Sequence, residues 1–204
     1  MLRQLFGSQF LRSVAVLSSG SFVAQILSIS VAPILTRLYS IDSFSTLALF
    51  SAIVSTIAVA AGGRYEIAVV TANNDNDAKY LIAISIWLAG FISIILAIFI
   101  YVRSEWLVNQ FKIDSLRSWL LILPFCIFLT VVTSVFQYQA NRYKNYALIS
   151  TTLVVQVVIN VIASIIFGII NIKNGMLIAY VLSTITAAIY ISIKSVGFDL
   201  KFWL

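Results

Sequence analysis

Six long stretches of the chain contain no acidic or basic residue, and all the charged residues lie in the segments around them. The stretches are residues 13–36, 43–63, 80–102, 118–141, 145–172 and 174–193. A helix needs about 20 apolar residues to cross a hydrocarbon core about 30 Å thick. No stretch alternates as the strands of a membrane barrel do. The pattern predicts an all-α integral membrane bundle of six transmembrane helices, at about residues 13–36, 43–63, 80–102, 118–140, 147–171 and 175–194.

The connections between these helices are short, so we expect one membrane domain over residues 1–204. Residues 195–204 are expected to form an interfacial tail, because aromatic residues favour the headgroup region. We interpret this tail as the end of a truncated sequence. The Asn/Asp-rich composition of residues 73–77 predicts a turn. The longest connection between predicted helices is expected at residues 103–117. Pro33 and Pro124 fall inside predicted helices, where each is expected to produce a kink.

The composition agrees with a membrane protein. Hydrophobic residues make up 61% of the chain and charged residues 10%, against about 25% charged in soluble domains. With the N-terminus inside, the inner segments hold eight of the 13 Lys and Arg residues and the outer segments five. The positive-inside rule therefore predicts that both termini are cytoplasmic. We attribute the excess of Lys and Arg over Asp and Glu to the orientation of the chain in the membrane, and we expect no nucleic-acid partner.

The residue types argue against an enzyme. The chain has no histidine and a single cysteine, Cys126, so His-based catalysis, His metal sites and internal disulfides are excluded. The predicted spans hold no ionisable side chain except tyrosines and Cys126, and no Gly-rich phosphate loop occurs. We expect no catalytic residue, no metal, no cofactor and no ATP hydrolysis by this chain.

Polar residues recur along one face of the first and fifth predicted helices. Gln25 lies in a row with Ser18, Ser21 and Ser28, and Gln156 and Asn160 lie in a row with Thr152 and Ser164. One interpretation is helix packing, since small and polar residues favour close contact between membrane helices. The other is a hydrated cavity, because large amides are costly in lipid. On the second interpretation Gln25, Gln156 and Asn160 bind substrate.

Charged residues at the helix ends supply the other candidate site residues. Arg37 and Arg64 follow the first two predicted helices. Each is either an interfacial anchor or a binding residue for an anionic substrate, since a guanidinium group matches phosphate oxygens. Glu66 is a candidate for proton or cation coupling, and an exposed interfacial carboxylate is the simpler expectation. Two residues apart, Arg64 and Glu66 would not face each other on a helix.

Several of these segments together resemble bacterial polysaccharide flippases, the O-antigen and capsule exporters. The segments are 18–21 (SSGS), 33–40 (PILTRLYS), 42–49 (DSFSTLAL), 63–70 (GRYEIAVV) and the basic turn 139–146 (QANRYKNY). Residues 42–45 depart from the family in lacking the glycine usual near the start of its second helix. A larger departure is that family members have about twelve or more helices in two lobes, whereas this chain has one lobe.

The resemblance implies flipping of undecaprenyl-pyrophosphate-linked oligosaccharide units across the bacterial inner membrane for O-antigen, lipopolysaccharide or capsule synthesis. It implies two lobes around a cationic cavity, with Arg37, Arg64 and Arg142 at the family's basic positions. The expected partners are the lipid-linked oligosaccharide, membrane lipids, a second lobe and components of a polysaccharide polymerase. Two alternatives stay open: the membrane subunit of an ATP-driven polysaccharide exporter, and a non-transporting scaffold of a polysaccharide assembly complex.

Overall fold

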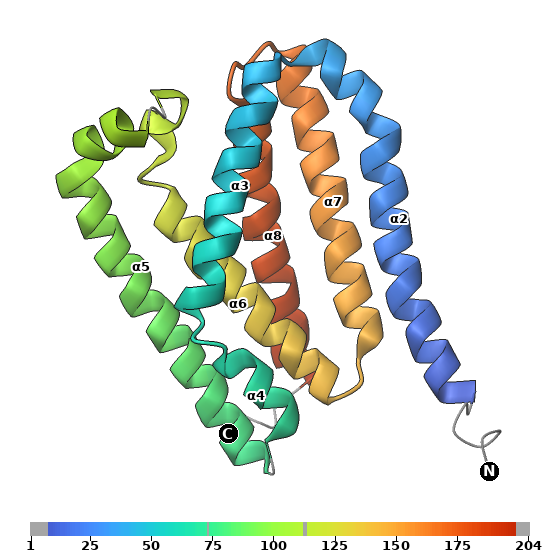
Figure 1. Cartoon of the computed structure of the whole chain (residues 1–204). Helices are drawn as coiled ribbons and strands as arrows, with labels where there is room; N and C mark the ends of the chain where they lie inside the picture. Colours follow the sequence, from blue (N-terminus) through green and yellow to red (C-terminus); the bar gives the residue numbers. More distant parts are fainter. Residues whose placement is uncertain (1–7, 73, 112–113, 199–204) are drawn as a thin grey trace. The chain divides into compact units, whose positions relative to one another are not determined.

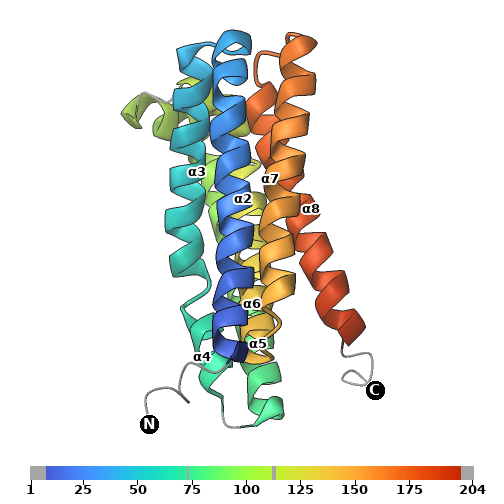
Figure 2. The ribbon, with the colours of Figure 1, turned by 90° about the vertical axis from the view of Figure 1, so that its right-hand side faces the viewer.

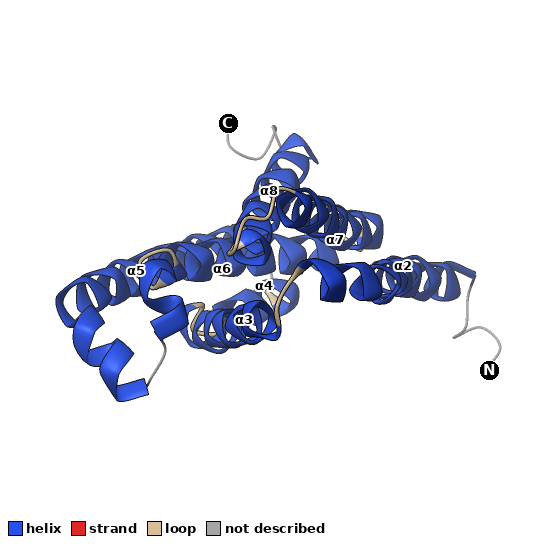
Figure 3. Cartoon of the chain, turned by 90° about the horizontal axis from the view of Figure 1, so that it is seen from above, coloured by secondary structure: helices blue, strands red, loops and turns tan. Residues whose placement is uncertain are grey.

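Every regular element that the structure describes is a helix (Figure 3). The computed structural model describes residues 8–72, 74–111 and 114–198. The helices are α2 (Ser8–Leu38), α3 (Ile41–Ala61), α4 (Tyr65–Thr71), α5 (Asp75–Phe111), the 3₁₀ helix η1 (Asp114–Trp119), α6 (Leu123–Arg142), α7 (Tyr146–Ile169) and α8 (Gly175–Phe198) (Figure 1). In the described residues, α2, α3, α5, α6, α7 and α8 are long and apolar enough to cross a membrane. The prediction of an all-α, multi-pass membrane protein is confirmed.

The third predicted span is the one whose ends differ most from the structure. α5 begins at Asp75, so the predicted turn at 73–77 is wrong for residues 75–77. Asp75 and Asp77 lie in its first turn, where carboxylates stabilise the positive end of the helix dipole. The predicted connection 103–117 is also wrong for its first half. Arg103 leaves helical geometry (φ −116, ψ 15), and beyond this kink the helix continues to Phe111.

Three smaller features also differ from the prediction. Pro124 is the second residue of α6, not an interior residue, and no kink is needed there because the first turn has no acceptor for its missing N–H. The short helix α4 was not predicted. α8 extends to Phe198, so the predicted tail is helical over residues 195–198, and residues 199–204 lie outside the described part.

The chain forms two compact units, each described by itself. The first combines Met1–Leu38 with Gln139–Leu204, and the second is Tyr39–Tyr138. In the first unit α7 lies between α2 and α8 (Figure 2). Small residues allow the close contact: Gly20 of α2 lies against Ser150 of α7, and a Cβ atom at Gly20 would come 1.9 Å from the Ser150 Oγ and 3.0 Å from its Cα. In α8 a row of mostly small residues is buried at every fourth position: Ala179, Ser183, Ala187 and Ile191.

In the second unit, the buried residues of α3 and α5 recur every three or four positions. The buried face of α3 consists of Thr46, Phe50, Val54, Ala58 and Ala61. The buried face of α5 includes Ala78, Ile82, Ser85, Ala89 and Ser93, whereas its large side chains Trp87, Phe91 and Tyr101 are exposed. Small residues inside and bulky apolar residues outside are typical of a helix whose outer face contacts lipid.

The contact between Gly20 and Ser150 generates the first prediction. The variant Gly20→Ala should lower the stability of the protein in detergent by about 1–3 kcal/mol, because overpacking forces the two helices apart. Thermal unfolding measures the change, and Ser150→Gly in the same molecule should restore part of it. The matched control is Gly90→Ala, whose added Cβ would lie 3.7 Å from Phe128, an ordinary contact. Equal effects of the two alanine variants would contradict this account.

Candidate functional site

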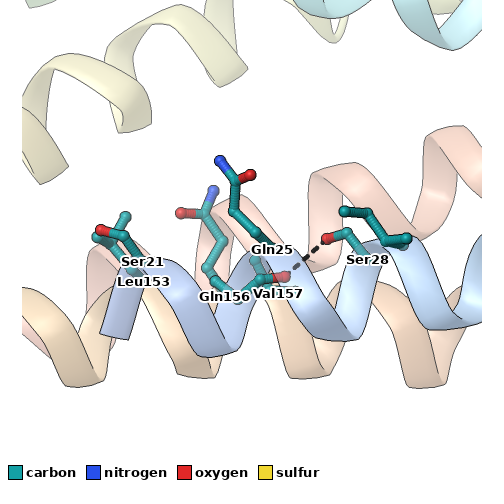
Figure 4. Close-up of a pocket in the computed structure, with 8 residues that line it drawn as sticks. Ser21, Gln25, Ser28, Leu153, Gln156 and Val157 are labelled. Atoms are coloured by element: carbon teal, nitrogen blue, oxygen red, sulfur yellow. Dashed lines mark hydrogen bonds between the residues drawn. The ribbon is translucent and has the colours of Figure 1, made fainter. Parts of the chain in front are cut away.

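A pocket lined by both polar and apolar side chains lies between α2 and α7 (Figure 4). Its volume is about 400 Å³, and it belongs entirely to the first compact unit. The lining residues are Ser21, Ala24, Gln25, Ser28 and Ile29 of α2 with Leu153, Gln156 and Val157 of α7. Ser21, Gln25 and Ser28 of the row on α2 therefore meet one residue, Gln156, of the row on α7.

The two glutamines of the pocket lie at the middle of their spans. Gln25 is near the centre of the span Val14–Leu38, and Gln156 is near the centre of Tyr146–Ile169. At about 1.5 Å of rise per residue, each amide lies roughly 15–20 Å from the ends of its span. The two helices run in the same direction, and both amide groups point to the same side of them (Figure 4). The site is therefore at the depth where a membrane contains least water.

Neither amide has a hydrogen-bond partner among the described residues. Within the part of the chain that the structure describes, Gln25 and Gln156 make no hydrogen bond. Each primary amide offers two N–H donors and one carbonyl acceptor, and leaving such groups unbonded in an apolar medium costs about 1–3 kcal/mol. Helix packing does not explain this cost, since the amides bond to neither helix.

The two serines of the pocket have a different hydrogen-bonding state. The Ser28 hydroxyl donates to the Ala24 carbonyl at 3.0 Å (Figure 4), and the Ser21 hydroxyl donates to the Leu17 carbonyl at 3.3 Å. Their protons are used within α2, so the oxygen lone pairs remain as acceptors. The pocket thus presents both donors and acceptors.

The pocket has no charge of its own, since none of the eight lining residues is ionisable. A phosphate or a metal ion would find no counter-charge there. Hydroxyl and amide groups of a neutral ligand would find hydrogen-bond partners of both kinds. Apolar side chains, Leu153 and Val157 among them, provide a surface for the carbon skeleton of such a ligand. The chemistry suits a neutral, polyhydroxylated group.

Asn160, the third predicted amide, is not part of this lining. Its side-chain nitrogen donates to the Ser183 hydroxyl of α8 at 3.4 Å. Thr152 and Ser164 of the same row are fully buried. In α7, the packing interpretation therefore describes these three residues, and the cavity interpretation describes Gln156.

Arg37 and Arg142 belong to the same unit as the pocket but lie away from it. Arg37 is in the last turn of α2 and is exposed. Twelve residues separate it from Gln25, which is about 18 Å along the helix. Arg142 ends α6 just before α7 and is half-buried. Because α2 and α7 run in the same direction, the two arginines lie at opposite ends of the unit.

Arg64 and Glu66 lie in the second unit, where their environments are opposite. Arg64 is exposed and adopts the left-handed conformation (φ 60) between α3 and α4. Glu66 is only 6% exposed, and its Oε2 atom is buried without a hydrogen-bond partner among the described residues. The expectation of an exposed carboxylate is wrong, because the turn through Gly63 and Arg64 directs the Glu66 side chain back onto Gly62.

The sequence did not single out the apolar lining residues or the role of Gly62. Leu153 and Val157 line the pocket because they lie three residues before and one residue after Gln156, a neighbourhood that helical spacing makes available once the polar residue is chosen. The sequence signal that could have indicated the role of Gly62 is its position four residues before Glu66, an isolated carboxylate. Comparison of the chain with protein-family models, characterised proteins and solved structures finds no match.

The free state of the two amides generates the second prediction. Gln25→Leu and Gln156→Leu should leave stability unchanged or raise it by up to about 1–3 kcal/mol, because an unbonded polar group is replaced by an apolar one. Asn160→Leu should instead cost about 0.6 kcal/mol, since it removes a hydrogen bond between membrane helices. Thermal unfolding in nanodiscs measures all three. Loss of stability in both glutamine variants would show that the amides serve packing.

Proposed function

We propose that this chain takes part in flipping a lipid-linked oligosaccharide across the bacterial inner membrane, as one lobe of a flippase. The substrate class is an undecaprenyl-pyrophosphate-linked repeat unit for O-antigen, lipopolysaccharide or capsule polysaccharide, with both termini of the chain cytoplasmic. The observation that carries the proposal is the pair of unbonded amides, Gln25 and Gln156, at the middle of two membrane spans. The substrate class is inferred from the resemblance of the chain's sequence segments to polysaccharide flippases.

The two amides lower the free-energy cost of moving a sugar across the membrane. Moving a saccharide through hydrocarbon strips water from its hydroxyl groups, and each loss without a replacement costs roughly 2–7 kcal/mol. At the midplane, where the cost is highest, the amides of Gln25 and Gln156 replace part of that water. The lipid tail needs no such site, because it stays in the bilayer throughout. Membrane transporters commonly bind substrate near the midplane.

The arginines have a separate task in this scheme. Arg37 and Arg142 lie at the two ends of the first unit, where the pyrophosphate would enter or leave, and Arg64 is exposed at the end of α3. A guanidinium group binds a phosphate through paired hydrogen bonds. In this scheme the pyrophosphate of the lipid is bound near the membrane surfaces, and the neutral sugar is bound at the midplane.

The two other functions differ in what they require. The membrane subunit of an ATP-driven exporter needs a cytoplasmic segment that contacts an ATPase, and a scaffold needs no lipid site. The unbonded midplane amides favour transport over a scaffold, because a scaffold gains nothing from their cost. Co-purification with an ATPase would support the exporter instead. A second lobe and polymerase components are the protein partners that the proposal entails.

Binding of the sugar generates the third prediction. By native mass spectrometry in nanodiscs, the protein should bind an undecaprenyl-pyrophosphate-linked oligosaccharide about tenfold or more tightly than undecaprenyl pyrophosphate alone, since two amides add hydrogen bonds of about 1 kcal/mol each. The double variant Gln25→Leu/Gln156→Leu should lose this difference. Gln137→Leu is the matched control, because Gln137 is a half-buried amide of α6 outside the pocket. Equal binding of the two lipids by the unmodified protein would refute the role of the pocket.

The charge of Arg64 generates the fourth prediction. In cells that depend on this chain for polysaccharide export, Arg64→Ala should reduce surface polysaccharide far more than Arg64→Lys, since only lysine keeps the positive charge. Both variants place a non-glycine residue at the same positive φ, so the backbone cost is similar. The control is Arg117→Ala, an exposed arginine paired with Glu105. If alanine and lysine reduce export alike at equal protein levels, Arg64 is only an interfacial anchor.

A further inference from the structure

The hydrogen-bonding groups of the pocket between α2 and α7 require a ligand group that both donates and accepts. The Ser21 and Ser28 hydroxyls already donate to carbonyls of α2, at 3.3 and 3.0 Å, so their oxygens serve a ligand only as acceptors. The side-chain carbonyls of Gln25 and Gln156 are acceptors as well, and the amide NH₂ groups of these two residues are the donors (Figure 4). A sugar hydroxyl matches this mixture, because it donates one hydrogen bond and accepts others.

An ionised carboxyl group matches the same mixture poorly. A carboxylate only accepts hydrogen bonds, so it can use the NH₂ groups of Gln25 and Gln156 but has no proton for the serine oxygens or the amide carbonyls. Those oxygens carry partial negative charge and would repel the carboxylate. The pocket therefore distinguishes between a hydroxyl group and a carboxylate at the same position of a ligand.

The two helices of the pocket place no positive charge near it. α7 contains no charged residue from Tyr146 to Ile169. On α2, the charged positions nearest to Gln25 are Arg12 and Arg37, 13 and 12 residues away, which is about 18 Å or more along the helix. An anion bound at the amides would therefore find no ion-pair partner on either helix.

The third long helix of the first unit does not supply the missing charge. Lys194 is the only charged residue of α8 between Gly175 and Phe198. The hydrogen bond from Asn160 to Ser183 aligns the antiparallel helices α7 and α8, so residue 187 of α8 is level with Gln156. Lys194 is seven residues further, about 10 Å along the axis, and α7 lies between α8 and α2 (Figure 2). Lys194 therefore cannot pair with a ligand in the pocket.

We infer that the pocket selects an uncharged sugar residue and excludes one that carries a carboxylate. The inference rests on the proposed function and narrows its substrate class. The volume of about 400 Å³ is at the small end of ligand pockets, which measure about 300–1,000 Å³, so the pocket holds part of an oligosaccharide at a time. The amides of Gln25 and Gln156 determine the specificity through the hydroxyl groups of that part. The resemblance to polysaccharide flippases implies a cationic cavity, whereas the lining of this pocket is uncharged.

Three lipids that differ in one substituent test the inference with the full chain in nanodiscs. Each is undecaprenyl pyrophosphate linked to the same disaccharide, whose terminal sugar is glucose, glucuronate or the methyl ester of glucuronate. Native mass spectrometry at about pH 7, where a carboxyl group is ionised, measures their binding against undecaprenyl pyrophosphate alone. The glucose lipid should bind about tenfold or more tightly than the glucuronate lipid, because the membrane midplane disfavours an unpaired charge. The methyl ester should bind like the glucose lipid, since it has no charge.

A charge added to the pocket should change the preference. Gln156→Arg should reverse the order of the glucose and glucuronate lipids, because a guanidinium group pairs with a carboxylate. The matched control is Ile189→Arg, which adds the same charge at an exposed position of α8 outside the lining and should keep the order of the unmodified protein.

The outcomes separate this inference from the proposed function. If the unmodified protein binds the glucuronate lipid as tightly as the glucose lipid or more tightly, and both more tightly than undecaprenyl pyrophosphate, the inference is overturned and the proposed function stands. If no sugar-bearing lipid binds more tightly than undecaprenyl pyrophosphate, both are overturned.

Discussion

The absence of water in the membrane interior is the constraint on which the rest of this structure depends. A polar group there must bond within the protein or remain costly. Most polar side chains of the described spans satisfy the rule locally. Ser28, Thr130 and Thr184 each donate to the carbonyl four residues earlier in the same helix. The rule makes the exceptions informative, because a group left unbonded at this depth has a cost that packing does not repay.

Further exceptions among the described residues include the Ser93 hydroxyl and the Gln139 carbonyl oxygen, which are buried without a partner. The exceptions at Gln25, Gln156 and Glu66 differ in position and in burial. Gln25 and Gln156 are unbonded at the middle of the first unit, on a pocket that a ligand can occupy. Glu66 is unbonded in the second unit, beyond the end of a span and sealed against Gly62. The first arrangement suits a neutral ligand that brings its own hydrogen bonds.

The fold class and the number of spans could be predicted because lipid imposes them on any sufficiently long apolar run. The helix ends could not, since an apolar run stops at the membrane surface but the helix need not. Asp75 begins α5 five residues before the apolar run, and Arg103 interrupts α5 without ending it. The rows holding Gln25 and Gln156 were visible as sequence spacing. Their meeting depends on Gly20 and Ser150, and the burial of Glu66 depends on the turn at Gly63 and Arg64.

Access of water to the midplane pocket tests the central claim most directly. With Cys126 replaced by alanine, Gln25→Cys should react with a hydrophilic, membrane-impermeant thiol reagent. Ile26→Cys, at the same depth but outside the pocket lining, should not react, because a thiol in lipid is neither hydrated nor ionised. We expect fast labelling at position 25 and none at position 26. Equal protection of both cysteines would contradict it, and would mean that the two amides lie in lipid or in a packed interface.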